Sequence, residues 1–444
     1  MNKSNFEAYA KQIGHEVTQL REDFHKHAES AWTEFRTASI LADKLAALGF
    51  AVKAGKEVFA GPRECVPSDE ILDAKYNRAL SESGSEKWMS LMKGGYTGVV
   101  AEIGQGEPVV AMRFDIDALP FAECQDKGYR PHDLNYASVH QGACHTCGHD
   151  GHAAMSYGVA KILKKFESDI VGTIRLVVQP AEEGVLGAAP MVAAGVMDGV
   201  SSVFAAHVSI DMQPGLIGGF GKKWAAGHKF DIRLTGQAAH SGGNPQGGRN
   251  AILAAATIIQ NLYALPRHSK GFTRVNVGTI NAGTNRNSIA PFAHMSAETR
   301  AETDKIDNSL YAKAERVIRS GAEMHDCECE IIPMGQAVSA ISDIDLIDYV
   351  KRTAPLLSDI GIDEQPLPGT GGCEDYTRMM QAVQNQGGQA VHFYVGADFK
   401  GEQEWTEQHR QMKAVAHSSI FDINEKGLVL GGMALAWLLI NTSR

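Results

Sequence analysis

Three short runs of almost continuous apolar residues constrain the fold of this chain more than any other feature. They are Pro108–Phe114 (PVVAMRF), Gly172–Val178 (GTIRLVV) and Ser201–Ala206 (SSVFAA). Runs of this length and composition are typical of strands that are buried on both faces at the centre of a sheet. Helical patterns lie between them, at 152–166 and 188–196. The sequence therefore predicts an α/β fold, with a mixed sheet flanked by helices.

The sequence pattern changes near residue 225. Alternating strands and helical stretches follow in the order 228–234, 250–262, 273–280, 293–300, 305–323 and 327–332. This β-α-β-β-α-β order describes a ferredoxin-like α+β unit. A chain of 444 residues is also too long for one ordinary core. We expect residues 225–335 to be a separate domain, inserted into a catalytic domain formed by residues 1–224 and 336–444.

Two further segments belong to the expected catalytic domain. Residues 4–48 have the apolar spacing of helices, and Gly49 is a stop signal. Residues 57–97 are charged, helical in places and bounded by Gly and Pro. We interpret this second segment as an insertion, whose role the composition does not reveal.

Charge and apolar pattern exclude several classes of protein. The net charge is −10, which disfavours general binding to nucleic acids or anionic membranes. The longest apolar run, 427–440, is shorter than the roughly 20 residues that span a bilayer, and the N-terminus lacks the apolar run of a signal peptide. Seven irregularly spaced cysteines suggest reduced thiols. We expect a cytoplasmic protein in which 427–440 forms a buried terminal helix.

The densest group of potential metal ligands lies at 144–152 (CHTCGHDGH). Cysteine and histidine are the usual ligands of zinc in proteins. Four local ligands from this stretch could also close a purely structural zinc knuckle. A long α/β chain has little need of such a staple, which favours a site of another kind.

More polar residues follow the predicted strands. They are Arg113, Asp115 and Asp117 after the first strand, Glu182 and Glu183 after the second, His207 at the end of the third, and His417 before the terminal helix. Each is weak evidence alone, because adjacent carboxylates are commonly solvated and a lone histidine is more often structural. Strand ends are, however, the usual place for sites in open α/β sheets. Their convergence predicts a metal site.

With these residues the sequence resembles the M20 metallopeptidase family, in its amidohydrolase branch. The matching motifs are RFDIDALP (113–120), CHTCGHDGH (144–152), QPAEEG (179–184), AAHV (205–208), GQAAHSGGNPQGGRNAI (236–252), GTNRNSIAP (283–291), GGCEDYT (371–377) and AHSSIFDINEKGL (416–428). They run in the family's order over nearly the whole chain. The resemblance implies a zinc-peptidase-like catalytic domain with a ferredoxin-like lid that also forms the dimer contact.

The resemblance also implies roles for single residues. Two Mn²⁺ or Zn²⁺ ions per protomer would be held by Cys147, His149, Glu183, His207 and His417. Glu182 would be the base that takes a proton from water, and His240 would stabilise the oxyanion, often in the other protomer's site. Arg300, with Asn287 nearby, would bind the substrate carboxylate. The residues expected to orient ligands or to support the structure are Asp115, Asp117 and His152, whereas Cys144 and His145 lie outside the ligand set.

The resemblance implies hydrolysis of p-aminobenzoyl-glutamate, a folate catabolite, to p-aminobenzoate and glutamate. The enzyme would be a homodimer, or a heterodimer with a related chain. Two alternatives stay open. One is a broader N-acyl amino acid deacylase or dipeptidase. The other is a non-catalytic partner subunit of a hetero-oligomeric hydrolase. Glu182 speaks against the second, because a chain without activity would be expected to have lost its base or a ligand.

Overall fold

The computed structural model describes residues 1–221, 223–365, 372–399 and 416–443. The chain divides into two compact units. The first comprises Met1–Lys222, Ile341–Pro368 and Arg378–Arg444, and the second comprises Lys223–Ala340 and Gly369–Thr377. The sequence analysis assigns 369–377 to the catalytic domain, but the structure groups it with the second unit. One reason is that the backbone carbonyl of Gly372 accepts a hydrogen bond from the N–H of Ala225 (2.9 Å).

The first unit contains an eight-stranded mixed sheet with the order β1-β2-β4-β3-β5-β14-β6-β13. The strands are β1 (Ala51–Ala54), β2 (Val99–Gly104), β3 (Val109–Asp115), β4 (Thr173–Gln179), β5 (Val200–Ser209), β6 (Leu216–Gly218), β13 (Gly361–Asp363) and β14 (Gln389–Gly396). Strand β3 pairs in parallel with β4 and β5, and β5 pairs in parallel with β14. The three predicted central strands are confirmed, and their carboxyl ends lie at one edge of the sheet.

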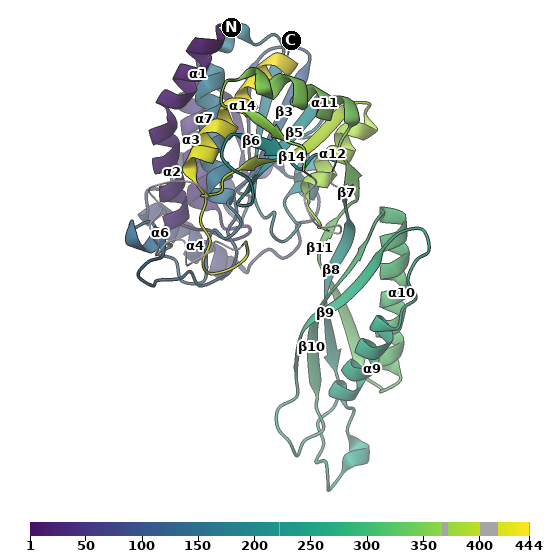
Figure 1. The fold of residues 1–444 in the computed structure, drawn as a ribbon. Coiled ribbons are helices and arrows are strands. Elements are labelled where there is room, and N and C mark those ends of the chain that lie inside the picture. Colours follow the sequence, from purple (N-terminus) through teal and green to yellow (C-terminus); the bar gives the residue numbers. More distant parts are fainter. Residues whose placement is uncertain (222, 366–371, 400–415, 444) are drawn as a thin grey trace. The chain divides into compact units, whose positions relative to one another are not determined.

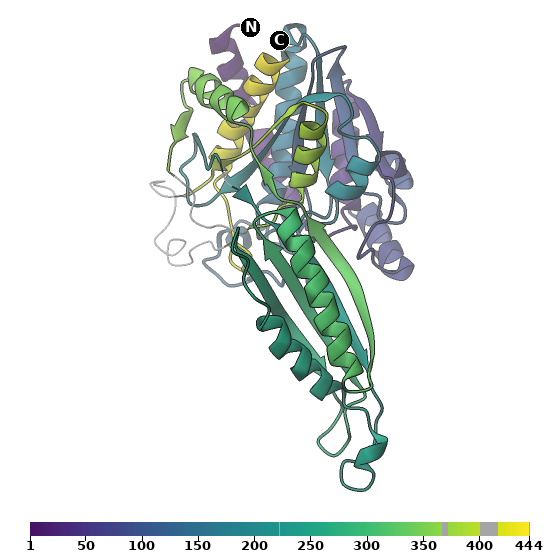
Figure 2. The ribbon, with the colours of Figure 1, turned by 90° about the vertical axis from the view of Figure 1, so that its right-hand side faces the viewer.

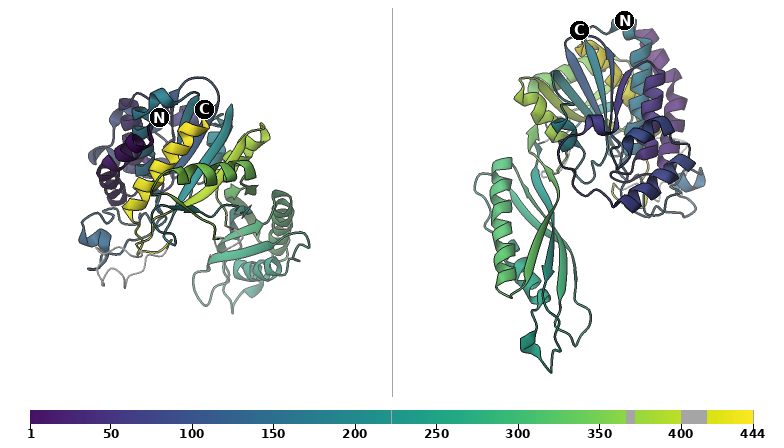
Figure 3. Two further views of the ribbon diagram at one scale, coloured as in Figure 1. Left: turned by 45° about the horizontal axis from the view of Figure 1, so that its top comes forward. Right: turned by 180° about the vertical axis from the view of Figure 1, so that it is seen from behind.

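Helices from distant parts of the chain pack together in this unit. They are α1 (Lys3–Gln12), α2 (Gly14–Lys26), α3 (Phe35–Ala47), α6 (Arg130–Asp133), α7 (His149–Lys165), α8 (Ala188–Ala193), α11 (Ile344–Thr353), α12 (Tyr376–Asn385) and α14 (Glu425–Thr442). The C-terminal helix α14 packs on α7, α1 and α2 (Figure 1), and both chain ends lie close together (Figure 3). Most of α14 is buried, as predicted. Among the described residues, no helix combines the length and apolar character that crossing a bilayer requires.

The N-terminal region departs from the continuous helical pattern predicted for residues 4–48. The chain leaves the helical conformation between Lys26 and Phe35. The buried carboxylate of Glu29 accepts hydrogen bonds from the N–H groups of Arg36 (3.0 Å) and Thr37 (2.9 Å). It therefore satisfies backbone donors in the first turn of α3 that no helical carbonyl can reach. The apolar spacing continues on both sides of this break, which hides the break in the sequence.

The insertion at 57–97 is part of the first unit's core. It contains α4 (Asp69–Ser81) and α5 (Glu86–Met92). Leu72, Met89 and Met92 are buried in the same apolar cluster as the helices around the sheet. The insertion therefore adds packing to the unit.

The second unit has a four-stranded antiparallel sheet with the order β11-β8-β10-β9. Its elements are β8 (Ala226–Thr235), α9 (Ala251–Tyr263), β9 (Thr273–Ala282), β10 (Phe292–Ala301), α10 (Asp304–Glu323) and β11 (Glu328–Ala337), and a separate two-stranded sheet joins β7 (Lys223–Trp224) and β12 (Ala340–Ile341). Helices α9 and α10 lie side by side over the four strands (Figure 2). The predicted ferredoxin-like β-α-β-β-α-β unit is confirmed.

Candidate metal centre

Polar side chains gather at the edge where β3, β4 and β5 end. Asp115 is the last residue of β3, Glu182 and Glu183 lie in the turn that follows β4, and His207 lies near the end of β5. Helix α7 begins at His149, next to this edge. Because the three strands are parallel, the sheet itself brings these side chains together.

The five predicted metal ligands fall into two overlapping groups. The ligand atoms of Cys147, His149 and His207 lie within 4.8 Å of one another, and so do those of Cys147, Glu183 and His417. The Cys147 sulfur is 3.4 Å from His207 Nε2, and His417 Nε2 is 3.6 Å from Glu183 Oε2. A sulfur that belongs to both groups is the arrangement expected of a thiolate shared by two ions.

Hydrogen bonds define which nitrogen each buried histidine offers. Nδ1 of His149 lies 3.0 Å from the backbone carbonyl oxygen of Asp117, and Nδ1 of His207 lies 2.7 Å from that of Val208. A carbonyl oxygen only accepts, so both Nδ1 atoms carry the proton and both Nε2 atoms keep a lone pair. Among the described residues, the buried Nε2 of His149 has no hydrogen-bond partner. A cation bound there would remove the cost of this orphaned atom.

The electrostatics of the cluster also fit a cation. Burial raises the pKa of the Cys147 thiol, although His149 opposes this shift. Burial also raises the pKa of Glu183, to about 7, with His149 again opposing. Burial lowers the pKa of His207 well below its ordinary range, and His152 adds to this effect. These surroundings favour neutral groups, whereas a divalent cation favours thiolate and carboxylate. Sulfur, imidazole and carboxylate donors together suit zinc or manganese.

Asp117 links the two halves of the cluster. Its Oδ1 and Oδ2 accept hydrogen bonds from the backbone N–H groups of Glu182 and Glu183, both at 3.0 Å, while its carbonyl oxygen accepts a hydrogen bond from His149. One buried residue therefore orients a histidine and both glutamates.

Asp115 and His152 support β5 beside the cluster. Asp115 accepts a hydrogen bond from Arg113 (2.5 Å) and contacts His152 Nδ1. Nε2 of His152 accepts a hydrogen bond from the N–H of Val208 (2.9 Å). Both ring nitrogens of His152 are therefore engaged by the protein, next to His207.

Gly148 allows the chain to present a ligand on each side of it. Its φ is 95°, in the region that favours glycine. A Cβ atom here would lie 2.3 Å from Val208 Cγ2. The two flanking residues, Cys147 and His149, can approach the cluster because position 148 has no side chain.

Cys144 and His145 are buried but belong to none of the close ligand groups found among the described residues. The N–H and carbonyl groups of Cys144 pair with those of Leu119, at 3.0 and 3.1 Å. Burial lowers the pKa of His145 to about 4. Nothing in this arrangement favours a local zinc knuckle.

The second unit carries the other predicted site residues. His240 is exposed, and its Nδ1 accepts hydrogen bonds from the N–H groups of Gly242 (3.2 Å) and Gly243 (3.0 Å). The ring proton of a neutral His240 therefore sits on Nε2, which has no hydrogen bond among the described residues. The Ser241 N–H donates to the Asn287 carbonyl (3.1 Å), so Asn287 lies beside His240.

Arg300 is bound by a carboxylate from its own strand. Its Nε and Nη2 donate to the two carboxylate oxygens of Glu298, at 3.0 and 2.9 Å. A substrate carboxylate at Arg300 would therefore compete with Glu298 or share the guanidinium with it.

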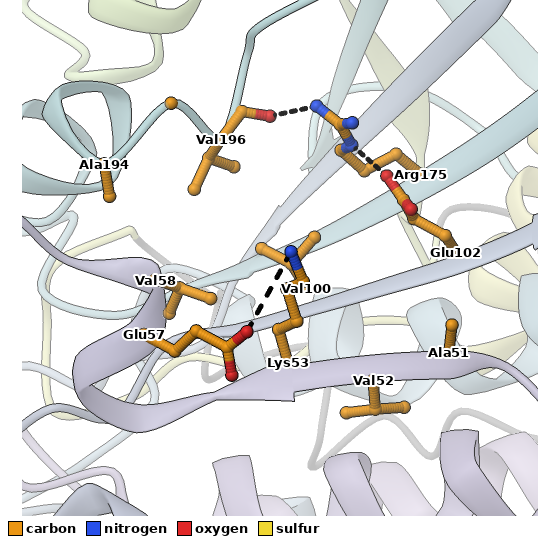
Figure 4. A pocket seen from close by; sticks show the side chains of 11 residues that line it. Ala51, Val52, Lys53, Glu57, Val58, Val100, Glu102, Arg175, Ala194 and Val196 are labelled. Atoms are coloured by element: carbon orange, nitrogen blue, oxygen red, sulfur yellow. Dashed lines mark hydrogen bonds and ion pairs between the residues drawn. The ribbon is translucent and has the colours of Figure 1, made fainter.

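A pocket of about 460 Å³ in the first unit lies elsewhere, over β1, β2 and β4. Figure 4 shows that its two cations face carboxylates, with Arg175 bonded to Glu102 (2.6 Å) and Lys53 3.9 Å from Glu57. None of its lining residues belongs to a close ligand group of the described residues. Its side chains therefore offer no chemistry comparable to the cluster at the strand ends.

Sequence patterns missed one residue that touches the cluster. Glu34 is fully buried, and its carboxylate accepts the N–H of Ala181, the residue before Glu182. In the sequence it is one acidic residue within a helical pattern, and such residues are usually solvated. Only the fold reveals this contact, between residues 147 positions apart.

Comparisons with known proteins agree with this geometry. Residues 111–418 match the model of peptidase family M20/M25/M40. Indole-3-acetyl-aspartic acid hydrolase from Enterobacter agglomerans is 37% identical over 98% of this chain and 97% of its own length. One of the named subunits of p-aminobenzoyl-glutamate hydrolase from Escherichia coli K12 is 35% identical with the same coverage. The crystal structure of an aminobenzoyl-glutamate utilization protein from Klebsiella pneumoniae superposes with a TM-score of 0.81, at 34% identity, covering 98% of this chain and 97% of that chain.

Proposed function

We propose a substrate from the premise that this chain belongs to peptidase family M20/M25/M40 and is a metal-dependent amidohydrolase. The proposed reaction cleaves the amide bond of p-aminobenzoyl-glutamate, giving p-aminobenzoate and glutamate. Indole-3-acetyl-aspartate is a second candidate, because the hydrolase named for it is equally similar to this chain. Both compounds join an aromatic acyl group to an acidic amino acid.

Two divalent ions, Mn²⁺ or Zn²⁺, are the proposed cofactors. They would be held by Cys147, His149, Glu183, His207 and His417. The observation that carries this proposal is the Cys147 sulfur, which belongs to two triplets of ligand atoms. When bound, such ions supply a Lewis acid that polarises a carbonyl oxygen and acidifies water.

Glu182 is the proposed general base. Its Oε2 lies 3.9 Å from His149 Nε2, so the carboxylate points toward the ligand atoms, and Asp117 holds its backbone. It would take a proton from the attacking water and deliver it to the leaving amine.

His240, Arg300 and Asn287 are proposed to handle the substrate. The Nε2–H of His240 would donate to the carbonyl oxygen as negative charge develops there. Arg300 would bind the α-carboxylate, since a guanidinium matches a carboxylate with two parallel hydrogen bonds. Asn287 lies beside His240 and would line the same substrate.

A dimer is proposed to complete the site, with His240 supplied by the partner protomer. The second unit offers an edge strand, β9, and exposed apolar side chains that a partner would cover, at Ile252, Leu253 and Ile280. The partner would be a second copy or a related chain. All seven cysteines are free thiols, which fits the proposed place of the enzyme in the cytoplasm, acting on folate catabolites.

The test is a comparison of kcat/KM for p-aminobenzoyl-glutamate, indole-3-acetyl-aspartate, benzoyl-glycine, acetyl-glutamate and a dipeptide. We expect p-aminobenzoyl-glutamate to lead. If benzoyl-glycine or the dipeptide led by tenfold, about 1.4 kcal/mol of transition-state preference, a broader deacylase or dipeptidase would replace the proposal. Turnover only after addition of a related chain would identify a hetero-oligomeric enzyme.

A further inference from the structure

The turn that carries Glu182 and Glu183 is held through three consecutive backbone N–H groups. Asp117 receives the N–H groups of Glu182 and Glu183. The N–H of the preceding residue, Ala181, donates to Oε1 of Glu34 at 2.9 Å. Two carboxyl groups thus bind one short run of amides, in the way that concave groups of backbone N–H bind anions.

The turn needs such support because its backbone is strained. Ala181 has a φ of 56° and Val185 a φ of 57°. Residues other than glycine adopt this region rarely and at an energetic cost. The surrounding structure must therefore impose the conformation, and the hydrogen bond to Glu34 acts on one of these two strained residues.

Glu34 is itself fixed at both carboxyl oxygens. Its side chain is fully buried, and its Oε2 accepts a hydrogen bond from the hydroxyl of Thr97 at 2.6 Å. Trp32, two residues earlier, packs with Ala181 and Leu186 in one apolar cluster. Glu34 therefore cannot move without disturbing the turn, and the turn cannot relax without losing Glu34.

Burial, together with the nearby negative charge of Asp117, raises the pKa of Glu34 well above its ordinary value. A neutral carboxyl group would still accept the Ala181 N–H at one oxygen, and its hydroxyl could donate to Thr97. Glutamine has the same shape and the same pair of functions. The site thus distinguishes the loss of the hydrogen-bond acceptor from the loss of charge.

We propose that Glu34 is a positioning residue for catalysis, which acts through the Ala181 N–H to hold the turn that aims Glu182 and Glu183. The proposal rests on the proposed function only for the role of Glu182 as the base. The holding of the turn can be measured without any substrate.

The experiment compares Glu34→Met with Glu34→Gln. Methionine keeps the unbranched shape but cannot accept the hydrogen bond. Since a displacement of about 1 Å can cost on the order of 10²-fold in rate, kcat of Glu34→Met should fall by about that factor, with KM and metal content retained. Glu34→Gln should stay close to the wild type. Loss of activity in Glu34→Gln equal to that in Glu34→Met would overturn the proposal.

Glu29 provides a matched control. It is an equally buried carboxylate five residues earlier that also accepts two hydrogen bonds, from the Arg36 N–H and from the Thr37 N–H, but it does not contact the turn. Glu29→Met should lower the melting temperature and leave kcat of the folded enzyme unchanged. An equal loss of kcat in Glu29→Met would reduce Glu34 to a structural residue.

Hydrogen exchange gives a readout that does not depend on the reaction. Amide exchange in the peptide covering 180–187 should become faster in Glu34→Met, unlike in Glu34→Gln or Glu29→Met. Thr97→Val, which removes only the support at Oε2, should show a smaller change in the same direction and serves if Glu34→Met does not fold. Unchanged exchange in both variants would overturn the proposal, whatever the substrate proves to be.

Discussion

The two units of the molecule present their candidate site residues in opposite ways. In the first unit, the ligand side chains lie at the edge of a buried parallel sheet, and backbone or carboxylate groups orient them one by one. In the second unit, His240 is exposed and Arg300 is bound to Glu298. The difference indicates that the metal centre is built into one unit, whereas the groups of the second unit are prepared in their protonation but gain a catalytic role only on meeting substrate.

The largest effect is expected in the first unit, at Glu182. Glu182→Gln keeps size and polarity but cannot accept a proton from water. General acid–base catalysis is typically worth on the order of 10²–10⁴-fold, and kcat should fall by at least that range while metal content stays intact. Steady-state kinetics with elemental analysis measure both. Wild-type turnover in this variant would remove Glu182 from the mechanism.

The next largest effect is expected in the second unit, at His240. Loss of one oxyanion donor costs about 10²–10³-fold in kcat, so His240→Ala should lose activity without losing metal. Mixing His240→Ala with Glu182→Gln protomers tests whether His240 acts in the partner's site. Some mixed dimers should regain one complete site. If protomer exchange is verified and no activity returns, His240 does not act across a dimer.

A smaller effect is expected at Arg300. Hydrogen bonds to charged groups contribute about 1.5–3 kcal/mol, so Arg300→Ala should lower kcat/KM for p-aminobenzoyl-glutamate by roughly 10–100-fold. Arg233, an exposed cation of the same sheet with Glu330 3.5 Å away, offers the control, and Arg233→Ala should be neutral. Equal values for both variants would show that the substrate carboxylate binds elsewhere.

The smallest effect is expected at Glu298. Glu298→Gln removes the carboxylate that competes for Arg300, so KM for an N-acyl amino acid should stay equal or fall while kcat is retained. A marked rise in KM would mean that Glu298 orients Arg300 for the substrate instead of competing with it.

Local sequence patterns predicted most of the fold because its elements have strong periodicity. The buried runs indicated β3, β4 and β5, and the alternation after residue 225 indicated the ferredoxin-like unit. The family motifs named the five ligands, which the structure brings together. The break between α2 and α3 was missed, because the carboxylate of Glu29 satisfies α3 from outside the helical spacing. Glu34 was missed for a related reason, since its contact with Ala181 exists only in the folded chain.

The pairing of Arg300 with Glu298 could have been predicted. Residues two positions apart on a strand lie on the same face, and opposite charges there attract. The sequence analysis assigned Arg300 to the substrate without weighing its neighbour. The structure gives the arginine a partner in the absence of substrate.

The central claim, that one thiolate serves two ions, is tested most directly by the metal content of purified protein. The account predicts two divalent ions per chain in the wild type. His417→Ala should keep about one, because Cys147, His149 and His207 remain. Cys147→Ser should lose most of both, because its sulfur belongs to both triplets. Full metal content in Cys147→Ser, or a single ion held by Cys144 and Cys147, would contradict the account.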